Sequence, residues 1–400
     1  MKSYPKRLLS SVLIITSLFL LTAFNPKDIR QDACLLQSYE KADCSEFVGK
    51  GAGSAENVIL LIGDGMGIGQ VYAGRVYLQG PEHPLKWEKL PHRGQVTTCA
   101  MYGITDSAAS GSAMATGHKA MTTTISMDHK REKHYKTILE HVQDYKATGL
   151  VTNTNLWDAT PAVFAAHSPS RSKSFDIARQ MVSHEVDVML GGGANEFSGN
   201  DEVGNQMERA RGMGYKVVRT RDELKAVDPA VTRKLMGIFK GGSLRFEVDW
   251  KPEHNEPHLS EMAQKALEVL EKDERGMFLM IEGAHIDHAC HKVSMDKLLG
   301  QMKEFDKTVN MVLDWQEEHP DTLVIITADH ETGGIRVWPK DYRKGDEIKV
   351  WWTTALVPGY AGHSSQRVPI YARGPNASAV KNHMQNTEVF CLMKNAFAEP

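Results

Sequence analysis

Short, continuous apolar runs constrain the fold of this chain more than any other feature of its sequence. Most are apolar at successive rather than alternate positions, which is typical of strands covered on both faces. Amphipathic stretches lie between them, such as 260–270 and the helical stripe that follows Ser294 and ends before Pro320. This order predicts an α/β fold, with a mostly parallel central sheet and helices on both faces. The runs are 58–62, 150–152, 186–190, 277–281, 323–327 and 368–372.

The chain divides into a leader, a lead-in and one large domain. Residues 1–24 have a basic start followed by an apolar stretch, which predicts a cleaved signal peptide; an uncleaved membrane anchor is the alternative. Residues 25–55 are polar, contain Gly and Ser, and are interpreted as mobile. Residues 56–400 form the predicted single domain with small insertions, in which 195–255 has no strong period and is interpreted as an excursion from the main sheet.

Net charge and cysteine content limit which binding partners and which cellular compartment we expect for this chain. The formal net charge is -3, and no Lys/Arg run supplies the basic face that nucleic-acid binding usually needs. A signal peptide predicts export, to the periplasm or outside the cell, and export permits disulfides. Cys34 and Cys44 are close enough in sequence to pair. We expect one surface bridge, with the remaining cysteines buried and at least one thiol free.

Ligand-type side chains stand directly after three of the apolar runs. Because the carboxyl ends of parallel strands meet at one edge of a sheet, we expect these side chains to lie close together. A helix cap is the structural alternative for Asp64 taken alone, but it does not account for the whole group. The residues are Asp64 after the first run, Glu282 after the fourth, and Asp329 and His330 after the fifth.

The segment after Glu282 adds a second pair of this kind. Asp287 and His291 are four residues apart, so on a helical turn they share one face and can hold one cation. Carboxylate and imidazole ligands together suit zinc. Such a pair is usually a solvated surface pair, but its place directly after a buried strand favours a site.

A run of small residues places a candidate nucleophile at the start of a helix. Residues 107–116 allow a tightly packed helix with Gly117 as its C-terminal stop. Ser107 then stands at the helix N-terminus, where the dipole and the free amides favour an anion. The alternative is that Ser107 or Asp106 is an ordinary cap.

Two further segments supply residues that suit an anionic ester. Asp158, Thr160 and Arg171 lie within fifteen residues of one another, and the Arg171 guanidinium can bind two ester oxygens at once. His363 precedes the last apolar run; in isolation it would be an ordinary loop residue.

Together these segments resemble the alkaline phosphatase family, and they occur in the order of that family between residues 57 and 375. They are 57–67 with Asp64, 105–109 with Ser107, Asp158 to Pro161, Glu282 to His291, Thr327 to His330, and His363. The resemblance implies an alkaline-phosphatase-like catalytic domain at 56–400, hydrolysis of phosphate monoesters, and a homodimer.

The resemblance also implies a role for each residue. The first of two zinc ions would be bound by Asp287, His291 and His363, and the second by Asp64, Asp329 and His330. Asp64 would also contact a magnesium ion held with Glu282 and Thr160. Ser107 would form a covalent phosphoserine, Arg171 would bind the phosphate, and Asp158 and His288 would lie around the magnesium site and the substrate.

Two alternatives stay open. A hydrolase of the same superfamily can prefer phosphodiesters or sulfates, although His167 stands where a sulfatase signature has its modifiable Cys or Ser. An exported protein that only binds phosphate or metal is the alternative from another class. It needs the cluster of acids and histidines but not Ser107 at a helix start.

Overall fold

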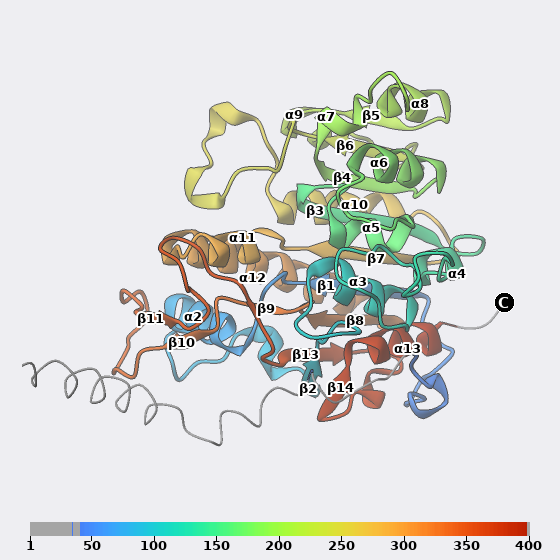
Figure 1. The fold of residues 1–400 in the computed structure, drawn as a ribbon. Coiled ribbons are helices and arrows are strands. Elements are labelled where there is room, and N and C mark those ends of the chain that lie inside the picture. Colours follow the sequence, from blue (N-terminus) through green and yellow to red (C-terminus); the bar gives the residue numbers. More distant parts are fainter. Residues whose placement is uncertain (1–33, 35–40, 398–400) are drawn as a thin grey trace, which may run out of the picture.

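The computed structural model describes residue 34 and residues 41–397, and its centre is a ten-stranded sheet (Figure 1). The strands lie in the order β14-β2-β13-β8-β1-β7-β3-β4-β6-β5. In that order they are His383–Gln385, His92–Thr97, Val368–Arg373, Thr322–Thr327, Asn57–Ile62, Met277–Glu282, Ala147–Asn155, Val188–Gly192, Leu235–Ile238 and Lys216–Val218. Two small sheets pair β9 (Glu331–Thr332) with β12 (His363–Ser364), and β10 (Ile335–Val337) with β11 (Val350–Trp352).

Every strand of the central sheet except β13 runs in the same direction. β13 pairs antiparallel with both β2 and β8, whereas all other neighbouring pairs are parallel. Each of the six predicted apolar runs overlaps one of these strands. The prediction of a mostly parallel α/β sheet is therefore confirmed.

Helices cover both faces of the sheet (Figure 1). Crossovers between parallel strands are right-handed, so connections that lead in opposite directions across the sheet place their helices on opposite faces. On one face α12 contacts α2, α10 and α11; on the other α3 contacts α4, α5 and α13, and α5 contacts α6. The first group is α2 (Ile68–Gln79), α10 (Leu259–Leu270), α11 (His285–His291) and α12 (Met295–Glu318). The second is α3 (Ser107–Thr116), α4 (Ile138–Val142), α5 (Ala159–Ala165), α6 (Ser174–Ser183) and α13 (Asn386–Ala396).

The region 195–255 extends the main sheet, which corrects the predicted excursion. Its strands β5 and β6 continue the sheet beyond β4, with α7 (Ala194–Phe197), α8 (Gln206–Gly212) and α9 (Arg221–Lys225) around them at the top of Figure 1. The two strands have only three and four residues. A strand of that length shows too few positions for a hydrophobic period to be recognised.

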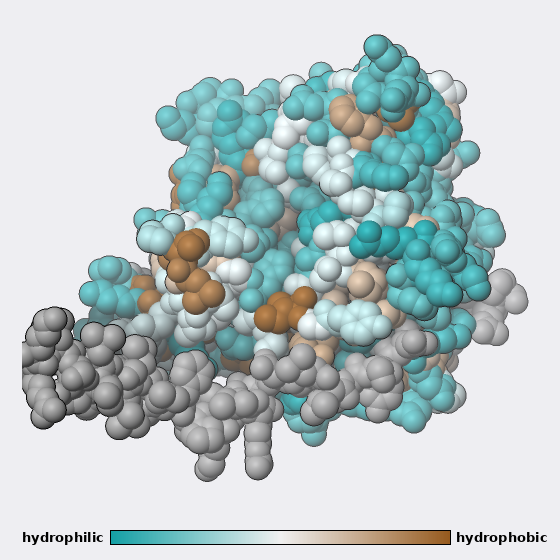
Figure 2. All heavy atoms as spheres, in the orientation of Figure 1, coloured by the Kyte–Doolittle hydropathy of each residue, from teal (hydrophilic) through white to brown (hydrophobic). Residues whose placement is uncertain are grey.

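The apolar runs form the core of the sheet. β1, β7 and β8 are buried at every position, so both faces of each strand are covered. Figure 2 shows that the visible surface is mainly hydrophilic, with apolar side chains in small separate groups. Burial of their apolar side chains away from water therefore places β1, β7 and β8 in the interior of the fold.

Two disulfides correct the expected cysteine pattern. Cys34 bonds to Cys99 and Cys44 to Cys391, across 65 and 347 residues of sequence, and Cys290 is a free buried thiol. Cys34 and Cys44, which are close enough in sequence to pair, do not bond to each other, and there are two bridges instead of the one expected. A disulfide requires Cα atoms within about 4.4–6.8 Å, a condition that the fold meets between distant segments rather than neighbouring ones.

The N-terminal part of the described chain is attached to the domain. Phe47 is buried, the Gly53 amide donates to the Asn395 carbonyl at 2.8 Å, and the Cys44 disulfide adds a covalent link. Residues 41–55 are thus held on the domain, although they belong to the segment predicted as mobile. The predicted signal peptide lies outside the described residues. None of the helices in the described part of the chain could span a membrane.

Candidate active site

The carboxyl ends of three neighbouring strands bring the predicted ligands together. Asp64 lies two residues beyond β1, Glu282 is the last residue of β7, and Asp329 and His330 follow β8. β1 lies between β7 and β8 in the sheet, so the three ends are adjacent. All four side chains are buried, with at most 5% of the residue surface exposed.

Asp64, Asp329 and His330 form one group. His330 Nε2 lies 3.4 Å from Asp64 Oδ1 and 3.2 Å from Asp329 Oδ2. Asp329 Oδ1 accepts hydrogen bonds from the amides of Gly65 and His330, at 3.2 and 2.9 Å. Asp64 Oδ1 and Asp329 Oδ2, in contrast, have no hydrogen-bond donor among the described residues. These two oxygens therefore point to a common, buried position beside an imidazole nitrogen.

Asp287, His291 and His363 form a second group beside the first. His291 Nε2 is 3.2 Å from Asp287 Oδ2, and His363 Nε2 is 3.6 Å from Asp287 Oδ1. The other nitrogen of each ring, Nδ1, donates to a backbone carbonyl: His291 to Ala361 at 2.6 Å and His363 to Thr105 at 2.8 Å. Their two Nε2 atoms face each other at 3.2 Å. Two lone pairs this close, with a carboxylate beside them, require a cation or a proton between them.

The local electrostatics favour bound cations at these carboxylates. Burial raises the pKa of Asp64 well above its usual value, and the nearby Asp329 raises it further. Burial also raises the pKa of Asp329 to about 6 and that of Glu282 to about 8. Burial acts in the same direction on Asp287, but hydrogen bonding and the charge of His291 hold its pKa far below the usual range. The charge of several carboxylates packed together at a buried site is stabilised by a bound cation.

Ser107 lies at the first position of α3, as predicted. Asp106 is the N-cap and its Oδ1 accepts from the Ala109 amide at 3.0 Å, and Gly117 ends the helix in the left-handed conformation, with φ 74°. Ser107 Oγ lies 3.2 Å from His330 Nε2. The side chain that sequence analysis selected as nucleophile therefore touches the acid–histidine cluster.

Arg171 is held by two carboxylates at the edge of the site. Its Nη1 donates to Asp106 Oδ2 at 3.2 Å and its Nη2 to Asp158 Oδ1 at 2.9 Å. Burial alone would lower the pKa of Arg171, but the charges of Asp158 and Asp106 raise it above its usual value. The guanidinium is therefore always charged and fixed in orientation, and it is close enough to lower the pKa of His330, which burial lowers most.

Glu282 lies among hydroxyl groups. Thr152 from β3 and Thr160 from α5 both hydrogen-bond to its carboxylate. Asp158, the N-cap of α5, adds a second negative charge nearby. His288 lies on α11, with its ring centroid 5.2 Å from that of His285, and no hydrogen bond or ion pair joins it to Asp158 in the described part of the chain.

Sequence analysis missed three residues that orient this site. Asp106 was considered only as a helix cap, yet it also holds Arg171. Thr332 donates to Asp287 Oδ1 and lies 3.2 Å from His330 Nδ1. Thr152 binds Glu282. A hydroxyl or carboxylate that acts on a distant side chain leaves no periodic signal in the sequence, so these contacts could be found only in the folded chain.

A serine at a helix start, an arginine held by two carboxylates and two acid–histidine groups lie at one edge of an α/β sheet. This combination is typical of a metal-dependent hydrolase of phosphate esters. A sequence model described as alkaline phosphatase matches residues 55–355. The chain belongs to the alkaline phosphatase family and is a phosphoric monoester hydrolase.

The chain is also similar to individual members over most of its length. It is 33% identical to streptomycin-6-phosphate phosphatase of Streptomyces griseus, over 85% of this chain and 90% of that protein. It is 31% identical to alkaline phosphatase of Escherichia coli, over 86% of both chains. Among solved structures, the alkaline phosphatase of the Antarctic bacterium TAB5 covers 86% of this chain and is itself covered to 98%, with a TM-score of 0.75 and 26% identity. A mutant of that enzyme is described with magnesium bound in its M3 site.

Proposed function

We propose that this chain hydrolyses phosphate monoesters through a covalent phosphoserine at Ser107, with two zinc ions and one magnesium ion bound beside it. The contact between Ser107 Oγ and His330 Nε2, at 3.2 Å, carries this proposal. It joins a nucleophile at a helix N-terminus to a cluster built for divalent cations.

The residues present fit the metals. Two buried carboxylate oxygens have no donor among the residues that the structure describes, and two imidazole nitrogens face each other; zinc would complete this arrangement. One zinc ion would be held by Asp287, His291 and His363, and the other by Asp64, Asp329 and His330. Magnesium would be held by Asp64, Glu282 and Thr160, whose oxygen donors suit it. When bound, these cations stabilise negative charge on the attacking and leaving oxygens.

The chain's own residues then divide the reaction into two displacements. Ser107 Oγ attacks phosphorus, the bond to the ester oxygen breaks, and the alcohol leaves with a proton. Water next attacks the phosphoserine, the bond to Ser107 Oγ breaks, and phosphate leaves as the serine hydroxyl is restored. Because α3 begins at Ser107, the positive end of its dipole faces the phosphoryl group in both steps.

Arg171 would bind the non-bridging oxygens of the phosphoryl group. Asp106 and Asp158 fix its guanidinium from two sides, so little orientation is lost when substrate binds. A phosphate monoester dianion carries two negative charges on its non-bridging oxygens, whereas a phosphodiester or a sulfate ester carries only one, so the fixed positive charge of Arg171 binds the monoester more strongly. This favours a monoester over the phosphodiester and sulfate alternatives.

Replacement of the nucleophile tests the mechanism. Ser107→Ala should lose nearly all hydrolysis of an aryl phosphate and should form no phosphoserine when the acid-quenched enzyme is analysed by mass spectrometry. Ser183→Ala, at an exposed serine of α6, is the matched control and should retain full activity. Normal turnover by Ser107→Ala would exclude the covalent mechanism.

Substrate comparison separates the alternatives. A phosphomonoesterase should hydrolyse an aryl phosphate with a higher kcat/KM than the corresponding diester or sulfate, and the reverse order would favour another ester. Substoichiometric release of phosphate from every ester would instead favour a phosphate- or metal-binding protein.

We further propose that the chain is exported, to the periplasm or outside the cell, and acts as a homodimer. Export is supported by the signal-like leader and by the two disulfides, because disulfides persist in oxidising compartments. The dimer follows from the family resemblance. Edman sequencing of the mature protein and sedimentation equilibrium test these two proposals.

A further inference from the structure

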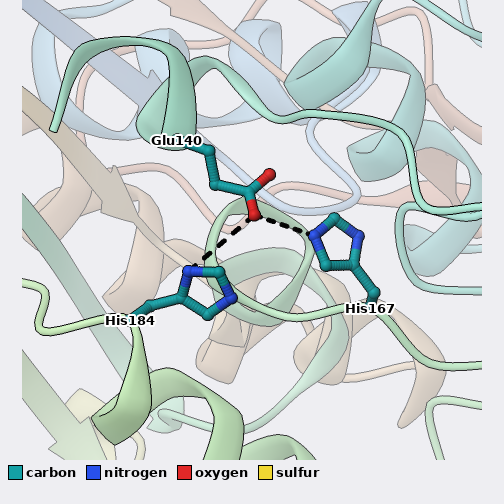
Figure 3. Close-up of side chains that lie close together, drawn as sticks. All are labelled: Glu140, His167 and His184. Carbon is teal, nitrogen blue, oxygen red and sulfur yellow. Dashed lines mark hydrogen bonds and ion pairs between the residues drawn. The ribbon is translucent and has the colours of Figure 1, made fainter. Parts of the chain in front are cut away.

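A third acid–histidine group lies outside the catalytic cluster. It consists of Glu140 in α4, His167 two residues beyond α5, and His184, the C-cap of α6. Figure 3 shows the two imidazole rings on either side of one carboxylate oxygen, each with a nitrogen directed at it. The three residues come from separate elements, so the fold and not local sequence brings them together.

The distances within the group match the spacing of ligands around one metal ion. Glu140 Oε1 is 3.0 Å from His167 Nε2 and 3.8 Å from His184 Nδ1, and all three atoms lie within 4.8 Å of one another. Metal–ligand distances of about 2.0–2.2 Å at a tetrahedral zinc place neighbouring ligand atoms about 3.4 Å apart. The observed separations lie on either side of that value.

Hydrogen bonds fix the two best-buried ligands in the orientation that a cation requires. His167 Nδ1 lies 2.9 Å from the Ser126 carbonyl, which can only accept, so Nδ1 carries hydrogen and donates. In the neutral ring Nε2 then carries a lone pair, which faces a carboxylate oxygen. The second oxygen of Glu140, Oε2, accepts from the Thr137 amide at 2.8 Å, which directs Oε1 to the imidazoles. Metal-binding histidines characteristically have such a carbonyl partner on their other nitrogen.

We propose that Glu140, His167 and His184 bind a divalent cation of the zinc type, at a site separate from the catalytic centre. A proton between Glu140 and His167 would satisfy that pair alone. A metal ion would also use His184, whose ring would need to shift by a few tenths of an ångström. Three protein ligands leave the fourth position of a tetrahedral ion for water.

The site is accessible and has room for a hydrated ion. The group lines a surface cavity of about 490 Å³, together with His134, whose ring stacks on His167 with centroids 4.4 Å apart. The side chain of His184 is 22% exposed and that of His167 is 6% exposed. An ion can therefore reach His184 first and be enclosed by the two better-buried ligands.

Zinc counting on the holoenzyme tests the proposal. Enzyme with loaded catalytic metals is equilibrated with zinc in dialysis and its metal content is measured, for the wild type, His184→Ala and Glu140→Gln. We expect one additional zinc ion per wild-type chain. Loss of a residue that hydrogen-bonds to a metal ligand lowers metal affinity about 10- to 100-fold. Loss of a ligand itself should therefore weaken this binding at least about tenfold. Anomalous scattering from zinc-equilibrated crystals should place a peak among the three side chains.

His83→Ala is the matched control, because His83 is exposed and belongs to none of the groups described here. It should bind the same zinc as the wild type. Retained hydrolysis of an aryl phosphate by His184→Ala would show that the fold and the catalytic metals are intact. Equal zinc counts for the wild type and His184→Ala, or wild-type crystals without a peak at the cluster, would overturn the proposal.

Discussion

Glu282→Gln should stabilise the metal-free protein at alkaline pH, although it should damage the metal-loaded enzyme. Glu282 is buried, accepts hydrogen bonds from Thr152 and Thr160, and faces the negative charge of Asp158. Without a cation, the ionised carboxylate has no positively charged partner in the described part of the chain, whereas glutamine keeps the shape of the side chain and carries no charge. Magnesium should reverse the order, because it stabilises the carboxylate and not the amide.

The magnitude follows from the proton that Glu282 retains. Burial raises the pKa of Glu282 from an ordinary 4.5 to about 8. The folded protein therefore holds the proton more tightly than the unfolded chain, so this stability is fully present below pH 4.5 and is lost as the pH rises through 8. At about 1.36 kcal/mol for each pH unit, the total is at most about 5 kcal/mol. From pH 9 to pH 5 the free energy of unfolding of the wild type should increase by about 4 kcal/mol relative to that of Glu282→Gln.

Urea denaturation in excess chelator measures this difference. The free energy of unfolding of wild type and variant is compared at pH 5 and pH 9, with the disulfides intact, and the comparison is repeated with magnesium. Glu253→Gln, at an exposed glutamate, is the control and should show the same pH dependence as the wild type. If the free energies of unfolding of the wild type and Glu282→Gln differ by the same amount at both pH values in chelator, ionisation of the buried Glu282 carboxyl group does not destabilise the metal-free protein.

Three further perturbations test the metal ligands, the role of Arg171 and the contribution of one disulfide to stability. Chelation should abolish hydrolysis and zinc with magnesium should restore it; activity that survives chelation would contradict the proposed ligands. Arg171→Lys keeps the charge but loses the fork between two carboxylates, so kcat/KM should fall about 10- to 100-fold, as expected for charge-assisted bonds of about 1.5–3 kcal/mol; an unchanged kcat/KM would exclude a clamping role. Cys44→Ser with Cys391→Ser opens a 347-residue loop and should lower the free energy of unfolding in urea by up to about 6 kcal/mol, without changing kcat; equal stability would show that the bridge adds nothing.

The sequence could predict features whose cause is local. A strand buried on both faces must be apolar at every position, so β1, β7 and β8 were recognisable as apolar runs. The bounds of α3 were predictable because small residues and a terminal glycine leave few alternatives. Acids and a histidine directly after buried strands indicated a site because parallel strands end at one edge.

Only the tertiary structure decided which distant groups meet. Cys44 pairs with Cys391 and not with Cys34, because packing of α13 against the N-terminal segment, and not distance along the chain, brings sulfur atoms together. The short strands β5 and β6 join the sheet through backbone hydrogen bonds, which any residue can form. Glu140, His167 and His184 have no shared spacing, and they converge only when α4, α5 and α6 pack. The hydrophobic periodicity of a segment indicates which of its faces is buried. Which segments contact each other depends instead on the free energy of the whole fold.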